Sequence, residues 1–143
     1  MTRIEDSKRR LIWHGMFLFL LGLLTGFDEQ QFNNPRMGLA AHLEGVMNGT
    51  FLIALGAVWT EVRLSPHQKA GILERAVRHV RELGNDTLAA IFGAASLSPI
   101  TGAGHSALPW QEQVVTFAFI TVGIAIVVSS ILVLWGLRRA AVS

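Results

Sequence analysis

The apolar segment from Met37 to Trp59 contains three polar side chains that could take part in chemistry: His42, Glu44 and Asn48. A segment of this length and composition is typical of a helix that crosses a membrane. Polar groups at membrane depth are unfavourable without a partner or a function, so each of the three is a candidate site residue. An imidazole can bind a metal, while a carboxylate and an amide can hold a substrate or carry a proton. His42 is the leading candidate.

His42 shares one face of this expected helix with several glycines. At 100° per residue this face is about 60° wide, and its members are Gly38, His42, Gly45, Gly49 and Gly56. Such a stripe lets another helix approach closely, as in Gly-x-x-x-Gly patterns. It would also accept a planar macrocycle, with the imidazole as axial ligand to iron. Spacing alone favours helix packing, because no second metal ligand is in view.

Glu44 and Asn48 form an i, i+4 pair about 120–160° around the helix from His42. Two interpretations stay open. Asn48 bonds to another helix while Glu44 lies near the lipid headgroups, or the two residues form a polar wall of a substrate pocket.

The polar residues outside this segment give weaker signals. His14 lies near the start of the first apolar run, where an interfacial position explains it. Asn85 and Asp86 form the next polar pair, for which a capping role and a site role are equally open. In the first run three glycines share a face about 40° wide, which favours close packing: Gly15, Gly22 and Gly26.

The elements that must position these residues are membrane helices. The chain has 143 residues, 51% of them hydrophobic, with a mean hydropathy of +0.44. Its apolar residues form long runs at Leu11–Phe27, Met37–Trp59 and Val114–Leu137, each near the roughly 20 residues that cross a bilayer as a helix. Indoles, which favour the membrane interface, stand near the ends of the expected spans: Trp13, Trp59, Trp110 and Trp135.

Basic residues predict the topology. They precede the first run, follow the last run and crowd residues 63–81, whereas residues 93–113 contain none. By the positive-inside rule both termini are cytoplasmic, Arg36 and His105 lie on the far side, and the number of spans is even. A fourth helix is therefore expected between Ile72 and Ser98. We predict one all-α transmembrane domain over residues 1–143, a four-helix bundle with helices at about 8–28, 37–62, 71–98 and 110–138, in a bacterial inner membrane.

The expected third helix differs from the others. Its first half, residues 72–83, keeps an apolar stripe with charges on the other face, which is typical of an amphipathic surface helix. Its second half, residues 87–98, is apolar and too short to span. The sequence leaves open whether the charged half projects into the cytoplasm or packs against protein.

Composition excludes several functional classes. The chain has no cysteine, which rules out disulfides, thiolate nucleophiles and thiolate-bound metals. It contains no nucleophile elbow, phosphate-binding loop, His-Glu-x-x-His motif or paired carboxylates. The pI near 9.9 reflects membrane topology, and no nucleic-acid partner is expected.

Four stretches resemble the hydroxylaminobenzene mutases, small membrane proteins related to styrene oxide isomerase. The stretches are His14–Phe27, Asn34–Gly49, Pro99–Gly104 and Leu132–Leu137. The resemblance implies a homotrimer of four-helix subunits in membrane lipid, with haem b between subunits. It also implies His42 as the iron ligand, with Gly45 and Gly49 beside the cofactor, and Asn48 as a substrate contact.

The same resemblance implies a reaction. We expect a mutase that converts a small aromatic hydroxylamine to a 2-aminophenol, with ferric haem b as a Lewis acid and no net redox change. Asn85 or Glu44 would relay protons. The related epoxide isomerase uses a tyrosine, and this chain has none. The alternatives are an epoxide isomerase, a non-catalytic haem protein and a packing subunit without cofactor.

Overall fold

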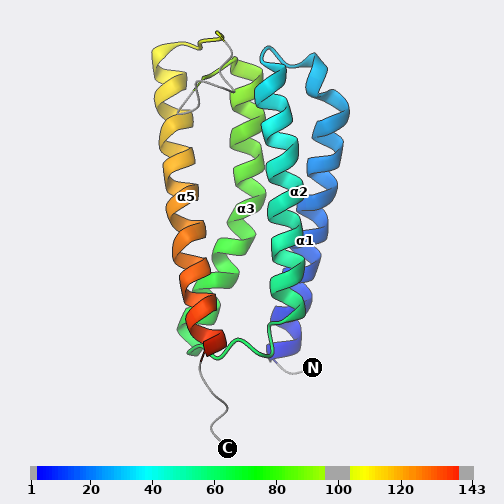
Figure 1. The fold of residues 1–143 in the computed structure, drawn as a ribbon, viewed down its shortest axis with the longest axis vertical. Helices are drawn as coiled ribbons and strands as arrows, with labels where there is room; N and C mark the ends of the chain where they lie inside the picture. Colours follow the sequence, from blue (N-terminus) through cyan, green and yellow to red (C-terminus); the bar gives the residue numbers. More distant parts are fainter. Residues whose placement is uncertain (1–2, 96–103, 139–143) are drawn as a thin grey trace, which may run out of the picture.

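The computed structural model describes the backbone of residues 3–95 and 104–138, and the side chains of residues 5–74, 87–95 and 104–138. The elements in chain order are α1 (Arg3–Asp28), the short 3-10 helix η1 (Glu29–Gln31), α2 (Pro35–Ala57), α3 (Pro66–Phe92) and α5 (Pro109–Arg138). The four long helices run alongside one another in a single bundle (Figure 1). The described residues contain no strand, so the predicted all-α four-helix bundle is confirmed.

Local sequence signals set the starts of two helices. α2 begins at Pro35, whose missing N–H suits a first helical turn, and the preceding Asn34 accepts a hydrogen bond from the backbone N–H of Met37 at 3.3 Å. α3 begins after Ser65, whose side chain accepts from the Gln68 N–H while the Gln68 side chain accepts from the Ser65 N–H. This reciprocal pair is a capping box.

The helix bounds differ from the predicted ones at several ends. α1 begins at Arg3 instead of residue 8, and α2 ends at Ala57 instead of residue 62 because the chain turns over residues 58–61. α3 covers 66–92 instead of 71–98. The capping box starts it early, and Gly93 ends it with a φ of 71°, a left-handed conformation that glycine adopts without strain.

Different segments of the chain meet at the two ends of the bundle. The start of α1, the connection of residues 58–65 and the end of α5 lie at one end, which we call the N-terminal end (Figure 1). There the backbone N–H of Arg63 donates to the Gly136 carbonyl at 3.1 Å. At the opposite end the backbone N–H of Asn34 donates to the Ala90 carbonyl at 3.2 Å. These two bonds tie the connections to neighbouring helices.

Glycines bring α1 and α2 into backbone contact along the most extensive interface of the fold. A Cβ atom at Gly49 would lie 2.6 Å from the Phe19 nitrogen and 2.8 Å from the Gly15 carbonyl oxygen. A Cβ atom at Gly22 would lie 2.7 Å from the Val46 nitrogen. No side chain fits at these positions, so α1 covers the glycine stripe of α2 from Gly45 to Gly56, while Phe32 and η1 cover Gly38.

Two apolar clusters fill the rest of the core. The larger cluster joins α1, α2, the start of α3 and the end of α5, with Leu18, Leu52, Ile72 and Val133 among its buried members. The smaller cluster lies at the opposite end, where Met37 of α2 meets Ala90 of α3 and Val115 of α5.

Three helices in the described part are long and apolar enough to cross a membrane: Glu5–Gln31, Pro35–Ala57 and Pro109–Arg138. α3 does not meet this measure, because its composition is too polar. It nevertheless contacts the other three helices, and Figure 1 shows it between α2 and α5. α5 leaves many large apolar side chains exposed, which suits contact with lipid acyl chains. The structure is that of a membrane-compatible helical bundle, and a fourth span at α3 stays a prediction.

We predict that Gly49→Ala destabilises the protein while Gly123→Ala does not. The new methyl group at residue 49 would overlap backbone atoms of α1, a strain worth about 1–3 kcal/mol. A Cβ at Gly123, also within a long helix, meets nothing within 4 Å. Thermal unfolding in detergent measures the difference. A Gly49→Ala protein as stable as the wild type would contradict the close helix approach.

Candidate functional site

His42 turns its imidazole toward α1. Its Nδ1 lies 2.8 Å from the carbonyl oxygen of Gly22. A carbonyl oxygen only accepts, so Nδ1 carries the proton and donates it. In a neutral imidazole this leaves Nε2 with a lone pair. The hydrogen bond thereby selects the tautomer that binds a metal or accepts a proton through Nε2.

Gly26 gives this imidazole its room. A Cβ atom at residue 26 would lie 2.6 Å from His42 Nδ1 and 3.0 Å from His42 Cε1. Those separations are shorter than van der Waals contact, so a larger residue would displace the ring. Two glycines one turn apart on α1, Gly22 and Gly26, therefore position His42 together.

His42 is half-buried and stands at a boundary on α2. On one side lies the glycine stripe that α1 covers. On the other side, by 100° per residue, lies an apolar face whose large side chains are exposed: Leu39, Leu43 and Met47. An apolar group bound to His42 from outside this chain would contact that exposed face.

Glu44 and Asn48 meet one turn apart on α2. The side-chain amide of Asn48 donates from Nδ2 to Oε1 of Glu44 at 3.3 Å, and both residues are half-buried. With Nδ2 engaged, Asn48 keeps Oδ1 as an acceptor for an N–H or O–H group. The pair has the polarity that the pocket-wall interpretation requires.

The structure does not bring His42 and Asn48 together within one chain. Six residues separate them, which is about 9 Å along the helix axis and about 120° around it. Their observed partners differ as well, since His42 contacts α1 and Asn48 contacts Glu44. A single chain therefore presents two separate candidate positions, which we call half-sites.

The other predicted residues fall into two groups. Gly45 and Gly49 face α1, which agrees with the helix-packing interpretation of the stripe, and their role beside a cofactor stays a prediction. The side chain of Asn85 lies outside the described residues. In the described part Nδ1 of His14 is buried without a hydrogen-bond partner, beside the edge of the Trp13 ring.

The described side chains form no group of three or more His, Asp or Glu residues that could hold a bare metal ion. Haem requires fewer protein ligands than a bare metal ion, because the porphyrin fills four coordination positions and the protein needs to supply only an axial ligand. His42 could supply this ligand through Nε2, and the exposed Leu39 and Leu43 offer apolar contact for a macrocycle.

Sequence reasoning missed the residues that support the site. It identified Gly22 and Gly26 as packing residues, but not as partners of His42, because a backbone carbonyl has no signature in the sequence. Among residues that fix the fold, Glu112 was missed as well: its Oε1 accepts from the backbone N–H groups of Ala95 at 2.9 Å and Ala107 at 3.0 Å. A lone carboxylate in the first turn of an apolar helix was the available signal.

We predict that Gly26→Ala disturbs the tautomer of His42. The new methyl group would push the imidazole from the Gly22 carbonyl, so the proton would no longer be held on Nδ1. Nitrogen NMR shifts of the imidazole, assigned by comparison with His42→Ala, should show one tautomer in the wild type and a mixture in the variant. Gly123→Ala is the matched control. An unchanged His42 signal in Gly26→Ala would contradict this arrangement.

Known proteins resemble the chain along nearly all its length. The sequence model of the styrene oxide isomerase family matches residues 7–138. Hydroxylaminobenzene mutase HabB of Ectopseudomonas oleovorans is 42% identical over 134 residues, which cover 92% of this chain and 82% of that protein. HabA of the same organism is 38% identical over 128 residues, covering 87% of this chain and 94% of that protein. No solved structure matches.

These matches confirm the resemblance that the sequence motifs indicated. Both relatives are named mutases and the family is named for an isomerase, so the predicted enzyme class, an isomerase, is confirmed as well. The chain belongs to the styrene oxide isomerase family.

Proposed function

We propose that this isomerase is a membrane-bound mutase that rearranges hydroxylaminobenzene-type arenes to 2-aminophenols. The observation that carries the proposal is the identity to two hydroxylaminobenzene mutases over most of the chain. The substrate is a small aromatic hydroxylamine, which partitions into lipid and reaches a site between membrane helices.

The proposed reaction changes no overall oxidation state. The N–O bond of the substrate breaks and a C–O bond forms at the ortho carbon. That carbon loses its proton, and the nitrogen gains one. Substrate and product are isomers, so no reductant and no nicotinamide cofactor is consumed.

We propose ferric haem b as the cofactor, which supplies a Lewis acid toward the oxygen of the breaking bond. His42 is the residue that holds it, through Nε2. The Gly22 carbonyl supports this role because its hydrogen bond to Nδ1 keeps the lone pair on Nε2 and fixes the orientation of the ring.

Asn48 and Glu44 act on the substrate in this proposal. Asn48 accepts a hydrogen bond from the hydroxylamino group through Oδ1, while its Nδ2–H group donates to Oε1 of Glu44. Glu44 orients the amide and takes up the proton from the ring carbon, with Asn85 as a second candidate for proton relay. The apolar surroundings exclude water, which strengthens these contacts.

A homotrimer with the cofactor between subunits accommodates the separation of the two half-sites. His42 and Asn48 face different sides of α2, so a group ligated by one subunit can meet the Asn48 of another. This assembly is part of the proposal and rests on the resemblance and on that separation.

The proposed location is the bacterial inner membrane, with both termini in the cytoplasm. The charges of the described residues support this orientation. The N-terminal end of the bundle carries several basic side chains, among them Lys8, Arg10 and Lys69, whereas Arg36 is the one Lys or Arg among described residues at the opposite end.

Purified protein is expected to convert hydroxylaminobenzene to 2-aminophenol without reductant or nicotinamide cofactor, as measured by product chromatography. Asn48→Ala should keep its haem and lose about 10²-fold in rate, the effect of removing one orienting contact. Thr50→Ala, exposed on the same helix, is the control. Phenylacetaldehyde from styrene oxide without any aminophenol would instead assign epoxide isomerisation, in a chain that has no tyrosine.

His42→Ala is expected to abolish the Soret band of the detergent-purified protein while leaving membrane insertion intact. The reason is that His42 is the histidine positioned by α1 with a free Nε2. His14→Ala is the matched control and should keep the band. Loss of the band in His14→Ala alone would identify the other histidine as the ligand, and a colourless wild-type protein would favour a packing subunit.

A further inference from the structure

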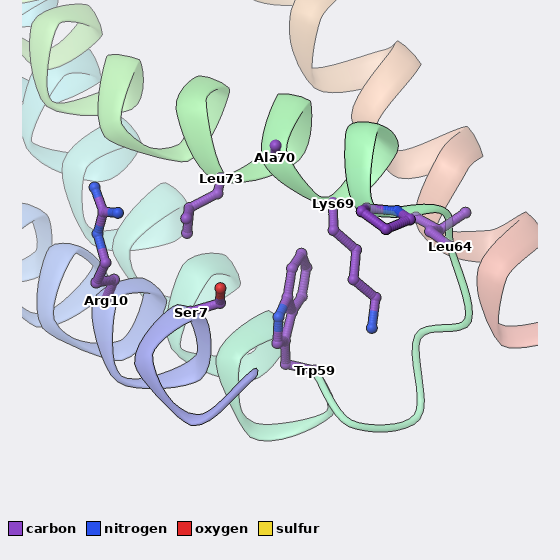
Figure 2. A pocket seen from close by; sticks show the side chains of 8 residues that line it. Ser7, Arg10, Trp59, Leu64, Lys69, Ala70 and Leu73 are labelled. Atoms are coloured by element: carbon purple, nitrogen blue, oxygen red, sulfur yellow. The ribbon is translucent and has the colours of Figure 1, made fainter. Parts of the chain in front are cut away.

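A cavity of about 530 Å³ opens at the N-terminal end of the bundle, far from His42. It lies between the start of α1, the residues that follow α2 and the first turns of α3, as Figure 2 shows. Its walls combine two cations with apolar and aromatic groups: Ser7, Arg10, Trp59, Leu64, Pro66, Lys69, Ala70 and Leu73.

Trp59 and Lys69 form the centre of this cavity. The indole of Trp59 is 1% exposed and so is fixed by the core. The Nζ of Lys69 lies 5.4 Å from the centroid of that ring, a cation–π distance. In Figure 2 Lys69 extends along one side of the indole, and Ser7 and Arg10 stand on the other side. The positive charge of Lys69 is therefore held in place at the cavity.

Among the described residues no carboxylate lines this cavity beside the two cations, although Asp6 borders a neighbouring hollow together with Arg10. In the described part of the chain no ion pair joins Arg10 or Lys69 to Asp or Glu. Two basic groups that share a cavity without a counterion attract an anion.

The apolar residues of the lining indicate that the anion also carries hydrocarbon. Leu64, Leu73 and Ala70 border the same space as the charges. A small free anion would leave these surfaces without contacts, whereas a lipid places a charged headgroup beside hydrocarbon. The position agrees with this, because Trp59 lies two residues beyond the end of a candidate span at Ala57, where membrane proteins commonly place indoles at the level of the headgroups.

The positive charge of the cavity also favours an anionic lipid over a zwitterionic one. A choline or ethanolamine group would bring a positive charge toward Arg10 and Lys69. The aromatic face that attracts such a group is occupied by Lys69. A headgroup with net negative charge has no such conflict.

We propose that this cavity binds the headgroup of an anionic phospholipid, with its phosphate drawn by Arg10 and Lys69 and the adjoining part of its chains against Leu64 and Leu73. This site is independent of the proposed catalytic function and lies at the other end of the bundle.

Native mass spectrometry of the full chain, titrated in detergent with phosphatidylglycerol or with phosphatidylcholine, tests the proposal. The wild type should bind phosphatidylglycerol more tightly. Arg10→Gln and Lys69→Gln should each weaken that binding about fivefold, the effect of one basic side chain at an anionic membrane surface. The charge-preserving pair Arg10→Lys with Lys69→Arg should retain it.

The matched control is Lys8→Gln with Arg63→Gln, which removes two charges at the same end outside the cavity lining. An equal loss in this control would assign the binding to diffuse surface charge and overturn the proposal. Equal affinity for both lipids would also overturn it. Displacement of phosphatidylglycerol by millimolar inorganic phosphate would identify a free-anion site in place of a lipid site. If a double variant fails to fold, the single variants Arg10→Gln and Lys69→Gln still test the proposal.

Discussion

The close approach of α1 to α2 is the constraint on which the rest of the structure depends. Because residues 15, 22, 45 and 49 have no Cβ, the two backbones meet at distances that no side chain would allow. This approach brings the Gly22 carbonyl within 2.8 Å of His42 Nδ1. Helix packing and histidine positioning are therefore one interaction. The glycines themselves serve packing, because α1 covers them, and a cofactor would meet His42 from the exposed apolar side of α2. The glycines pack so that the histidine beside them is held in one orientation.

The sequence predicted those features that depend on residues close together in the chain, such as the helices and their caps. Long apolar runs predicted three of the helices, because a membrane-compatible backbone must satisfy its own hydrogen bonds. The distribution of basic residues predicted the fourth. The sequence could not predict how each helix is rotated about its axis, since that depends on neighbours far along the chain. His42 was singled out from its type and its place among glycines, whereas the carbonyl it contacts was not, because every residue has a carbonyl. The early start of α3 was readable from Ser65-Pro66 and Gln68, which form its cap.

α3 illustrates how tertiary context changes the meaning of a sequence. Its polar composition is typical of a surface helix, and composition alone does not make it a membrane candidate. Yet it contacts α1, α2 and α5 and joins both apolar clusters through residues such as Ile72 and Ala90. It is the helix that holds α5 to the bundle. At its described ends Ile72, Ala89 and Ala90 are buried, whereas Leu88 and Ile91 are exposed. A polar mean composition therefore does not prevent a helix from contributing to an apolar core.

The separation of His42 from Asn48 bears on why subunits would associate. Apolar faces gain little by meeting each other in lipid, because acyl chains are as apolar as the side chains they replace. The exposed apolar surfaces of α2 and α5 therefore supply no strong drive toward assembly by themselves. A cofactor ligated on one subunit and contacted by another would supply specific bonds across the interface. In the proposed trimer the same group would join the subunits and unite the two half-sites, so assembly and catalytic competence would depend on one interaction.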